Sequence, residues 1–397
     1  MAQVRGLYTF NGVLHAVVGS DLRRIDSNGV GTSLATIGSA GGPVDMQQNL
    51  SQLVIADGAQ LYVWNGTALQ TVSTYSAGDA LAFVDQRCVF PLRGTQTFMW
   101  TALGDAASID PLAFASVEGS PDGLVAILSN LRELLMLGEN TGEVWLSVGG
   151  TTVFERSQSE FLHVGCAAAR SLVLVGDTPF WLGRDADGQA QVVAGRGKRV
   201  STRAIEERFE GLDLAAARAY TYSDGGSRFY CLNVPNVPTT LVYDLTFAQW
   251  HERAELVEGE YEPWRPVCHA FAYGRHFFGA DDGRIFRLDA GLHAFDGDIK
   301  ARDRISPVVS SPDMRRLTFS VFEVLCERGT AGTVMLRHSD DNGATWSNWR
   351  TDTAGALGEY RNRIRFNRLG SARDRVLHVR MTDAAPFNPV AADVGIT

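Results

Sequence analysis

Short apolar runs separated by turn residues recur along most of this chain. The clearest unit is the stretch Leu53–Gly66, in which two apolar runs alternate with the dipeptides Asp57-Gly58 and Asn65-Gly66. Asp-Gly and Asn-Gly favour tight hairpin turns, because these turns need positive φ angles that Gly and Asn adopt at low cost. We therefore expect two β-strands here, joined and followed by turns.

Similar units recur through the first three quarters of the chain, and most place an aromatic or branched residue shortly after a turn. Six further copies are Gly19–Gly29, Gly94–Trp100, Thr141–Gly150, Gly176–Gly183, Thr240–Trp250 and Asp282–Gly291. Their spacing of roughly 35 to 65 residues is close to the ~40–50 residues of a four-stranded propeller blade. The pattern predicts a β-propeller of about six or seven blades, with a large β-sandwich as the alternative.

The pattern changes in the last quarter, so we expect two domains, residues 1–292 (propeller) and 293–397 (C-terminal β-domain). Strands are predicted at Leu317–Leu325, Thr333–Arg337 and Val376–Met381, with the first two pairing across the intervening glycines. These runs fit a small β-sandwich or barrel. The single helix expected in the chain spans Ser201–Phe209, with Ser201 or Thr202 as its N-cap.

Charge is distributed unevenly between the two regions. The net charge of the whole chain is −9; residues 1–291 carry 21 basic and 32 acidic side chains (net −11), and residues 292–397 carry 15 and 13 (net +2). An acidic body argues against tight binding to a phosphate backbone. Excess negative charge suits a surface that DNA slides along without being bound.

Several classes of function find no support in the sequence. The five cysteines are widely spaced and odd in number, which indicates buried free thiols rather than a disulfide framework or a zinc site. We find no catalytic constellation, cofactor motif or metal cluster. No window is long and apolar enough for a membrane anchor, and the N-terminus does not resemble a signal peptide, so we expect a protein made in a cytoplasm.

The stretch from Ser339 to Trp346 matches the Asp-box pattern Ser-x-Asp-x-Gly-x-Thr-Trp. Its fixed positions are Ser339, Asp341, Gly343, Thr345 and Trp346. We expect Asp341 to accept backbone hydrogen bonds across the turn, Gly343 to adopt positive φ, and Trp346 to plug the hairpin into the core. The box is specific as a turn and says little about chemistry. It also occurs in sialidases, but the arginine cluster and tyrosine nucleophile of a sialidase are not evident.

An arginine-rich run is the second distinctive stretch of the C-terminal region. A strand over this run would place alternate arginines on one face. The candidate partner interface comprises Arg361, Arg363, Arg365, Arg368, Arg373 and Arg375. It is either a face that docks on an acidic neighbour or a solvated edge strand that charge protects from aggregation.

The run Phe114–Trp145 contains Phe114-Ala-Ser-Val-Glu-Gly-Ser-Pro-Asp122, followed by Arg132-Glu-Leu134 and by Gly138-Glu-Asn-Thr-Gly-Glu-Val-Trp145. It resembles the packaged-DNA stabilisation proteins, also called tail hub or nozzle proteins, of short-tailed bacteriophages, whose pattern is "F-A-S-x-E-G-x-P-D" leading to "R-E-L…G-E-x-T-x-E-V-W". The run Val242–His251 is a weaker match. Residues ~339–381 include a run similar to "G-E-Y…R-x-R…L-G-x-A-R-D-R-V".

The resemblance implies a non-enzymatic structural virion protein, assembled in the host cytoplasm and located in the tail. It implies a ring, expected to be a homohexamer, below the portal and its adaptor, with tail needle or fibre proteins as further partners. Genomic DNA would pass through the lumen without sequence-specific binding, and the ring would retain the packaged genome until ejection. The alternative is a carbohydrate-binding or sialidase-like propeller, and a receptor-binding tail protein is a third possibility.

Overall fold

The computed structural model describes residues 2–72, 75–120, 122–150 and 152–396 and is built almost entirely of β-strands. It divides into a propeller unit, Met1–Ala254 with Pro263–Leu288, and a C-terminal unit, Glu255–Glu262 with Asp289–Thr397. The predicted all-β propeller followed by a small β-domain is confirmed as the fold class. The division at residues 292 and 293 stays a prediction; the units found here also assign the hairpin Glu255–Glu262 to the C-terminal unit.

Seven antiparallel sheets make up the propeller in the described residues, one for each blade. The strands of the first four blades are β1 (Val4–Phe10), β2 (Val13–Val18), β3 (Asp21–Ile25) and β4 (Gly31–Thr36) in blade 1; β5 (Asp45–Asn49), β6 (Gln52–Ala56), β7 (Leu61–Trp64) and β8 (Leu69–Val72) in blade 2; β9 (Ala82–Val84), β10 (Arg87–Pro91), β11 (Thr97–Trp100) and β12 (Phe114–Ser116) in blade 3; and β13 (Leu124–Asn130), β14 (Glu133–Gly138), β15 (Gly142–Ser147) and β16 (Phe154–Leu162) in blade 4.

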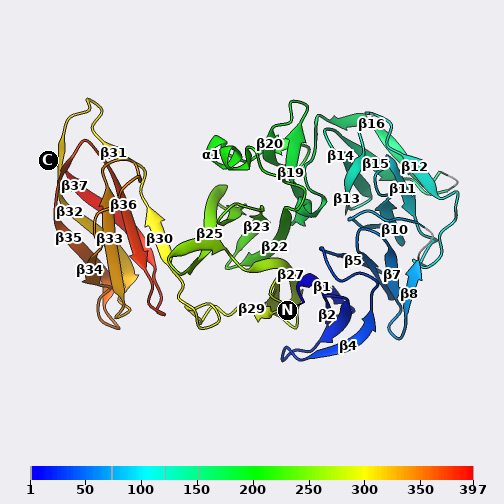
Figure 1. Ribbon diagram of the computed structural model, residues 1–397, viewed down its shortest axis with the longest axis horizontal. Coiled ribbons are helices and arrows are strands. Elements are labelled where there is room, and N and C mark those ends of the chain that lie inside the picture. The colour runs from blue at the N-terminus through cyan, green and yellow to red at the C-terminus, as the bar shows by residue number, and fades with distance from the viewer. Residues whose placement is uncertain (1, 73–74, 121, 151, 397) are drawn as a thin grey trace. The chain divides into compact units, whose positions relative to one another are not determined.

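The remaining blades vary this plan. Their strands are β17 (Val164–Cys166), β18 (Val173–Val175), β19 (Thr178–Asp185), β20 (Ala190–Ala194) and β21 (Lys198–Arg199) in blade 5; β22 (Arg218–Asp224), β23 (Ser227–Asn233), β24 (Thr240–Asp244), β25 (Gln249–Val257) and β26 (Glu260–Pro263) in blade 6; and β27 (Pro266–Ala272), β28 (Arg275–Ala280) and β29 (Ile285–Arg287) in blade 7. The first strands that are labelled in Figure 1 (β1, β5, β13, β22 and β27) surround the centre of the propeller unit.

The hairpins form where the turn chemistry predicts them. In the opening unit, Asp57 Oδ1 accepts hydrogen bonds from the backbone of Ala59 (3.0 Å) and Gln60 (2.8 Å), and Gly58 has a φ of 82°. The turn joins β6 to β7, whose apolar residues are buried on both faces. Both faces are buried because each blade packs between two others.

A separate apolar cluster lies between each pair of neighbouring blades, so seven clusters complete the ring. The last of them joins blade 7 to blade 1, with Phe277 packed among residues of β1 and β2. Blade 7 and blade 1 share no sheet. Tyr273 reinforces this seam: its hydroxyl donates to the carbonyl of Ile25 (2.8 Å) and accepts from the amide of Leu14 (3.1 Å). The ring therefore closes by side-chain packing.

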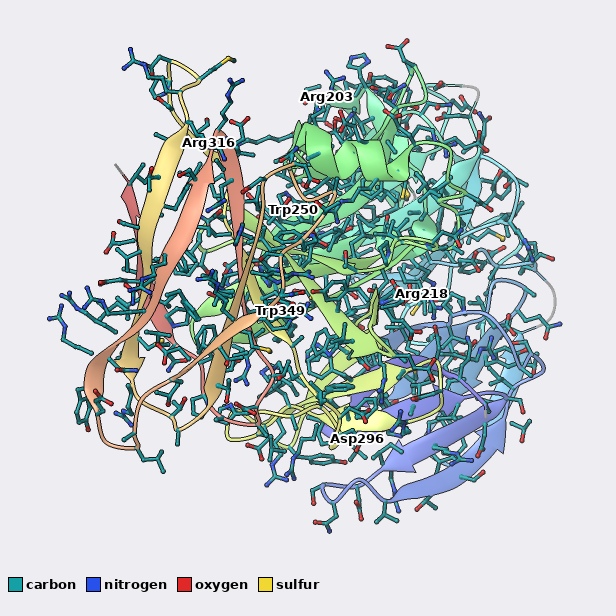
Figure 2. The ribbon with its side chains drawn as sticks, turned by 60° about the vertical axis from the view of Figure 1, so that its left-hand side comes forward. Arg203, Arg218, Trp250, Asp296, Arg316 and Trp349 are labelled. Carbon is teal, nitrogen blue, oxygen red and sulfur yellow. The ribbon has the colours of Figure 1, made fainter. Side chains whose placement is uncertain are left out.

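The expected helix is shorter than predicted. One α-turn, α1 (Arg203–Glu206), continues as the 3₁₀ turn η2 (Glu207–Phe209), and Figure 2 shows Arg203 on it; a second 3₁₀ turn, η1, spans Ala169–Ser171. Thr202, one of the two predicted caps, occupies the N-cap position, but its side chain makes no capping hydrogen bond. The Ser201 hydroxyl instead donates to Glu206 (2.6 Å). Ile205 and Phe209 enter the cluster between blades 5 and 6, so the helix bridges two blades.

The C-terminal unit is a sandwich of two sheets. One has the order β30-β36-β33-β34, with β31 also paired to β36, and the other has the order β35-β32-β37. The strands are β30 (Arg302–Ile305), β31 (Val309–Ser310), β32 (Leu317–Arg328), β33 (Thr333–Ser339), β34 (Arg350–Thr353), β35 (Tyr360–Ala372), β36 (Asp374–Met381) and β37 (Pro389–Ile396).

The expected pairing of the first two strands of this unit is wrong. β32 pairs with β35 and β37, whereas β33 pairs with β34 and β36. The chain crosses from one sheet to the other between β32 and β33, and each strand contributes one face to the core between the sheets. A short glycine-containing connection is compatible with both a hairpin and a crossing, and the sequence pattern did not distinguish them.

No helix in the described residues is long and apolar enough to cross a membrane.

Candidate assembly surface

The Asp box folds into the turn that its sequence predicts. Asp341 accepts hydrogen bonds from the Ser339 hydroxyl (2.7 Å), the Thr345 amide (2.8 Å) and the Thr345 hydroxyl (2.6 Å). The Gly343 amide donates to Ser339 Oγ (2.8 Å), and Gly343 has a φ of 95°. The bonds from Thr345 and Ser339 lower the pKa of Asp341 to about 2. The box therefore serves as a structural turn.

Trp346 does not plug into the core, which corrects one expectation. Its ring lies over the Arg337 guanidinium (4.5 Å to the ring centroid) and meets the edge of the His378 ring (5.4 Å between centroids). His378 and Arg380 alternate along β36 with the core residues Leu377 and Val379. Trp346 thus packs on the outer face of the sheet that contains β36.

A stack of aromatic rings and arginines, which the sequence analysis missed, covers this outer face. Arg337 lies between Trp346 and Trp349 (4.5 and 4.6 Å), Arg380 lies over Trp349 (5.2 Å), and Tyr261 follows (5.7 Å from Arg380). Figure 2 shows Trp349 in the C-terminal unit. We call this outer face the closed face. The spacing Trp-x-x-Trp after a strand containing an arginine was the available signal.

Polar bonds beneath the stack fix its geometry. Arg337 Nε donates to His378 Nδ1 (3.0 Å), so the His378 ring proton is on Nε2, which donates to Asp303 Oδ1 (2.6 Å). Burial disfavours ionisation of Asp303, but hydrogen bonds from His378, Arg380 and Tyr261 outweigh it and hold the pKa of Asp303 well below its usual range. The charged side chains of the closed face therefore pair with one another.

The opposite sheet presents the arginines differently. Along β35, Arg361, Arg363 and Arg365 are exposed, and they alternate with inward residues that include the fully buried Ile364 and Phe366. We call these three arginines the arginine row. Arg365 bonds to Glu323 on the neighbouring strand, and Arg363 lies 3.7 Å from the same carboxylate. One acid thus faces two arginines of the row.

The other members of the predicted interface divide into two groups. Arg368 and Arg373 are exposed towards the far end of β35. Arg375 is 2% exposed, makes a two-pronged ion pair with Asp340 (2.6 and 2.7 Å), and donates to the carbonyl of Leu369 (2.6 Å). Its guanidinium also lies over the Phe319 ring (4.5 Å). Arg375 is therefore a structural residue, and its inclusion in an accessible interface is corrected.

The remaining polar groups of the described residues form no reactive centre that their geometry reveals. Among the described residues, no three His, Cys, Asp or Glu side chains come together as a metal site requires. Two surface hollows lie in the propeller, one between blades 4 and 5 and one between blades 6 and 7. The five cysteines are free thiols, and burial raises the pKa of Cys88, Cys231 and Cys268 to about 12.

Comparison with protein families gives two matches that together cover nearly the whole chain. The family described as bacteriophage P22 Gp10, beta-propeller, matches residues 2–292, and the family described as bacteriophage P22 Gp10, beta-sandwich, matches residues 304–397. No curated protein matches the chain.

Solved structures resemble the chain only distantly. The extracellular domain of a hybrid two-component system from B. thetaiotaomicron has a TM-score of 0.49 at 10% identity; the match covers 90% of this chain and 46% of that one, so this chain spans about half its length. The Neurospora crassa Pan2 WD40 domain has a TM-score of 0.44 at 9% identity and coverages of 72% and 88%. Dihydro-haem d1 dehydrogenase NirN has a TM-score of 0.45 at 12% identity and coverages of 91% and 75%.

Proposed function

The chain belongs to the bacteriophage P22 Gp10 family, and on that premise we propose that it assembles into a closed ring in the phage tail. Members of this family are structural proteins of the phage tail that stabilise packaged DNA. The chain therefore has this structural function. The observation that carries the assignment is that the two family matches account for both the propeller and the sandwich.

The ring we propose is a homohexamer placed below the portal and its adaptor. Identical subunits that contact each other through two different surfaces close into a ring when the rotation between them permits it. Tail needle or fibre proteins would bind the ring further along the tail. In this arrangement the ring extends the DNA channel and holds the genome until ejection.

Charge supports a role beside DNA that does not involve tight binding. Residues 1–291 carry 21 basic and 32 acidic side chains. A surface with excess negative charge repels the phosphate backbone, and a channel of this kind lets a duplex slide. Genomic DNA is therefore proposed as a passing occupant of the lumen that the protein does not bind by sequence.

The arginine row is our candidate for the surface that docks on an acidic neighbour in the tail. Its three side chains project from one strand, and arginine forms two-pronged bonds with carboxylates. The Asp box has a supporting role in the same unit, since its bonds hold the turn that positions Trp346.

Membership of a structural family argues against catalysis. The sialidase-like alternative is not favoured, because the family matches cover the chain and the one Asp box that the sequence contains lies in the C-terminal unit, where its carboxylate is engaged by the turn itself. We infer that the protein has no enzymatic role.

The proposal is tested by removing the gene from the phage and supplying it from a plasmid. Without the protein, particles should package DNA but lose it, measured as genome that is no longer protected from added nuclease. Wild-type protein should restore protection, and a variant with Arg361→Glu and Arg363→Glu should not. Particles that lack the protein yet retain full genomes and infectivity would contradict the proposal.

A further inference from the structure

The longest connection within a propeller blade in the described residues is an ordered loop. Residues Thr101–Ala113 join β11 to β12 in blade 3, and we call them the blade-3 loop. Ala106 is fully buried, and its amide donates to Gln52 Oε1 (2.7 Å), while Gln52 Nε2 donates to Asp105 Oδ1 (3.0 Å). The Gly104 amide donates to the carbonyl of Gln86 (2.9 Å). Long loops that are fixed in this way are commonly binding elements.

The loop nevertheless exposes large apolar side chains. Leu103 is 61% and Leu112 is 81% exposed. Leu50, at the adjoining β5–β6 turn, is 49% exposed and lies against Gly104. Leu50 therefore adds an exposed leucine of blade 2 beside the loop of blade 3, which itself exposes two.

The backbone at Leu50 adds to the argument. Its φ is 50°, a left-handed conformation that is unusual for a bulky residue. Blade 4 has the same feature at the turn after its own first strand, where Leu131 has a φ of 57° and is 89% exposed. Asn11, Asp85 and Tyr273 also have left-handed φ at this turn in blades 1, 3 and 7, so the turn type recurs around the propeller. What distinguishes blades 2 and 4 is the exposed leucine that each places in this turn.

The exposed apolar side chains in the turns and loops of the propeller unit lie on one rim. In each blade the turn after the first strand and the turn after the third lie on the same rim, because neighbouring strands are antiparallel. The large hydrophobic residues exposed in these turns and loops are Val30, Leu50, Leu103, Leu112, Leu131, Val148, Phe247 and Tyr273. Among the described residues of the propeller unit, the connections at the opposite rim expose none of comparable size. A one-sided apolar rim is typical of an interaction surface.

The charge of the blade-3 loop limits what can bind there. The loop contains Asp105 and Asp110, both exposed, and no basic residue. A suitable partner therefore presents apolar side chains together with basic ones.

The C-terminal unit presents such a surface. Tyr360 is 68% exposed and directly precedes Arg361, and Leu357, four residues before Arg361, is 80% exposed. The exposed Glu359 between them accepts the Ala356 amide (3.1 Å). Val390, on the same sheet, is 66% exposed. This apolar and basic end of β35 is complementary to the blade-3 loop both in charge and in apolar character.

We propose that the blade-3 loop of one copy receives the arginine row and its apolar end from a second copy of this chain. The inference rests on the proposed function, since it identifies the acidic neighbour of the arginine row. The two surfaces differ, so each copy offers one of each and the contact propagates from copy to copy around a closed ring.

The test uses charge reversal in the plasmid-supplied phage that lacks the gene. The row variant carries Arg361→Glu and Arg363→Glu, and the loop variant carries Asp105→Arg and Asp110→Arg. Each alone places like charges together and should lower the titre at least about 100-fold. The control, Asp187→Arg with Asp213→Arg, makes the same charge change at the opposite rim and should leave the titre within about threefold of wild type.

Combining the variants identifies the partner. A chain with both sets of changes should recover the titre, and so should cells that make the row variant and the loop variant as separate chains. Recovery in one chain without recovery in the mixture would mean contact within a chain and overturn the proposal. Failure of both combinations would mean that the row docks on another tail protein, which overturns the proposal but leaves the proposed function in place.

Folding of the loop variant needs its own check, because the Asp105 carboxylate also accepts the Ala107 amide (3.0 Å). Thermal unfolding of each purified variant supplies it. A second variant, Leu103→Ser with Leu112→Ser, changes only exposed side chains and should also lower the titre at least about tenfold. A normal titre for this folded variant would overturn the proposal.

Discussion

The two outer faces of the C-terminal sandwich show that arginines in similar sequence patterns can have opposite roles. On the closed face, Arg337 and Arg380 are held between aromatic rings and bonded to His378 and Asp303. On the other face, Arg361 and Arg363 project from β35, and a single carboxylate, Glu323, pairs with both Arg363 and Arg365. The difference lies in the opposing strands and loops. Local alternation places a side chain on a face, and only the fold decides whether that face is covered.

The largest effect is expected from Arg375, which has the burial of a core residue. Arg375→Ala should remove the ion pair with Asp340 and leave a cavity beside Phe319, destabilising the C-terminal unit by about 3 kcal/mol. Hydrogen exchange of residues 317–396, followed by mass spectrometry, measures this unit separately. The exposed neighbour is the control: Arg373→Ala should change protection by no more than about 0.5 kcal/mol. Equal effects at both positions would contradict the structural role of Arg375.

The next effect is expected at the closed face. Trp349→Ala should cost about 2 kcal/mol or more, because it opens the stack between Arg337 and Arg380. Trp349→Phe retains a ring between the two guanidinium groups and should recover part of the loss. Hydrogen exchange of residues 317–396, measured for both variants and the wild type, compares their free energies of unfolding. If alanine and phenylalanine were equally tolerated, the stack would not stabilise this face.

Acid should affect the His269 region of the propeller before the Asp-box turn. Burial, together with the nearby His276, lowers the pKa of His269 to about 3, so the fold keeps this imidazole neutral. Its stabilising contribution is complete above the unfolded pKa near 6.5 and is lost as pH falls towards 3, by at most about 2 kcal/mol at pH 5. The pKa of Asp341 is lowered to about 2, so its contribution is present above the unfolded value near 4 and is lost between pH 4 and 2.

Exchange measured at pH 7, 5 and 3, corrected for the intrinsic rate, separates these ranges. Residues 220–280 should lose protection between pH 7 and 5, and the Asp-box turn, residues 339–346, should lose it only below pH 4. His269→Phe should reduce the first loss, part of which is left to the neighbouring His276, and should leave the second unchanged. Simultaneous loosening of both regions near pH 4 would show that His269 does not govern the first step.

The smallest effect on stability is expected from the arginine row. Arg361→Glu with Arg363→Glu should change the unfolding free energy by no more than about 0.5 kcal/mol, because both side chains are exposed. The same change should abolish genome retention in particles. Arg361→Lys with Arg363→Lys retains the charge and should preserve more function than the glutamate variant. Loss of stability that paralleled the loss of function would make the row a structural feature like the closed face.

Turn chemistry and period were sufficient to predict most of the fold. Asp57-Gly58 and the recurring apolar runs indicated the blades. Few folds other than a propeller repeat strands buried on both faces at a period of ~40–50 residues. The row of Arg361, Arg363 and Arg365 followed from strand alternation. These inferences depend on neighbours in the sequence.

The remaining features depend on contacts between distant segments. The side chain of Arg375 follows the same alternation as a core residue, and its partner Asp340 lies 35 positions away. Trp346 packs on Arg337 and His378 because the sheet that contains β36 turns that face outward. The crossing between β32 and β33 had no local signal that separates it from a hairpin. Such pairings become visible only when the sheets are assembled.

Quantitative mass spectrometry of purified virions tests the central claim most directly. The ratio of this chain to the portal subunit gives its copy number in the particle. The account expects about half as many copies as the portal, as a sixfold ring on a twelvefold portal requires. Complete absence of the chain from purified particles would contradict the account.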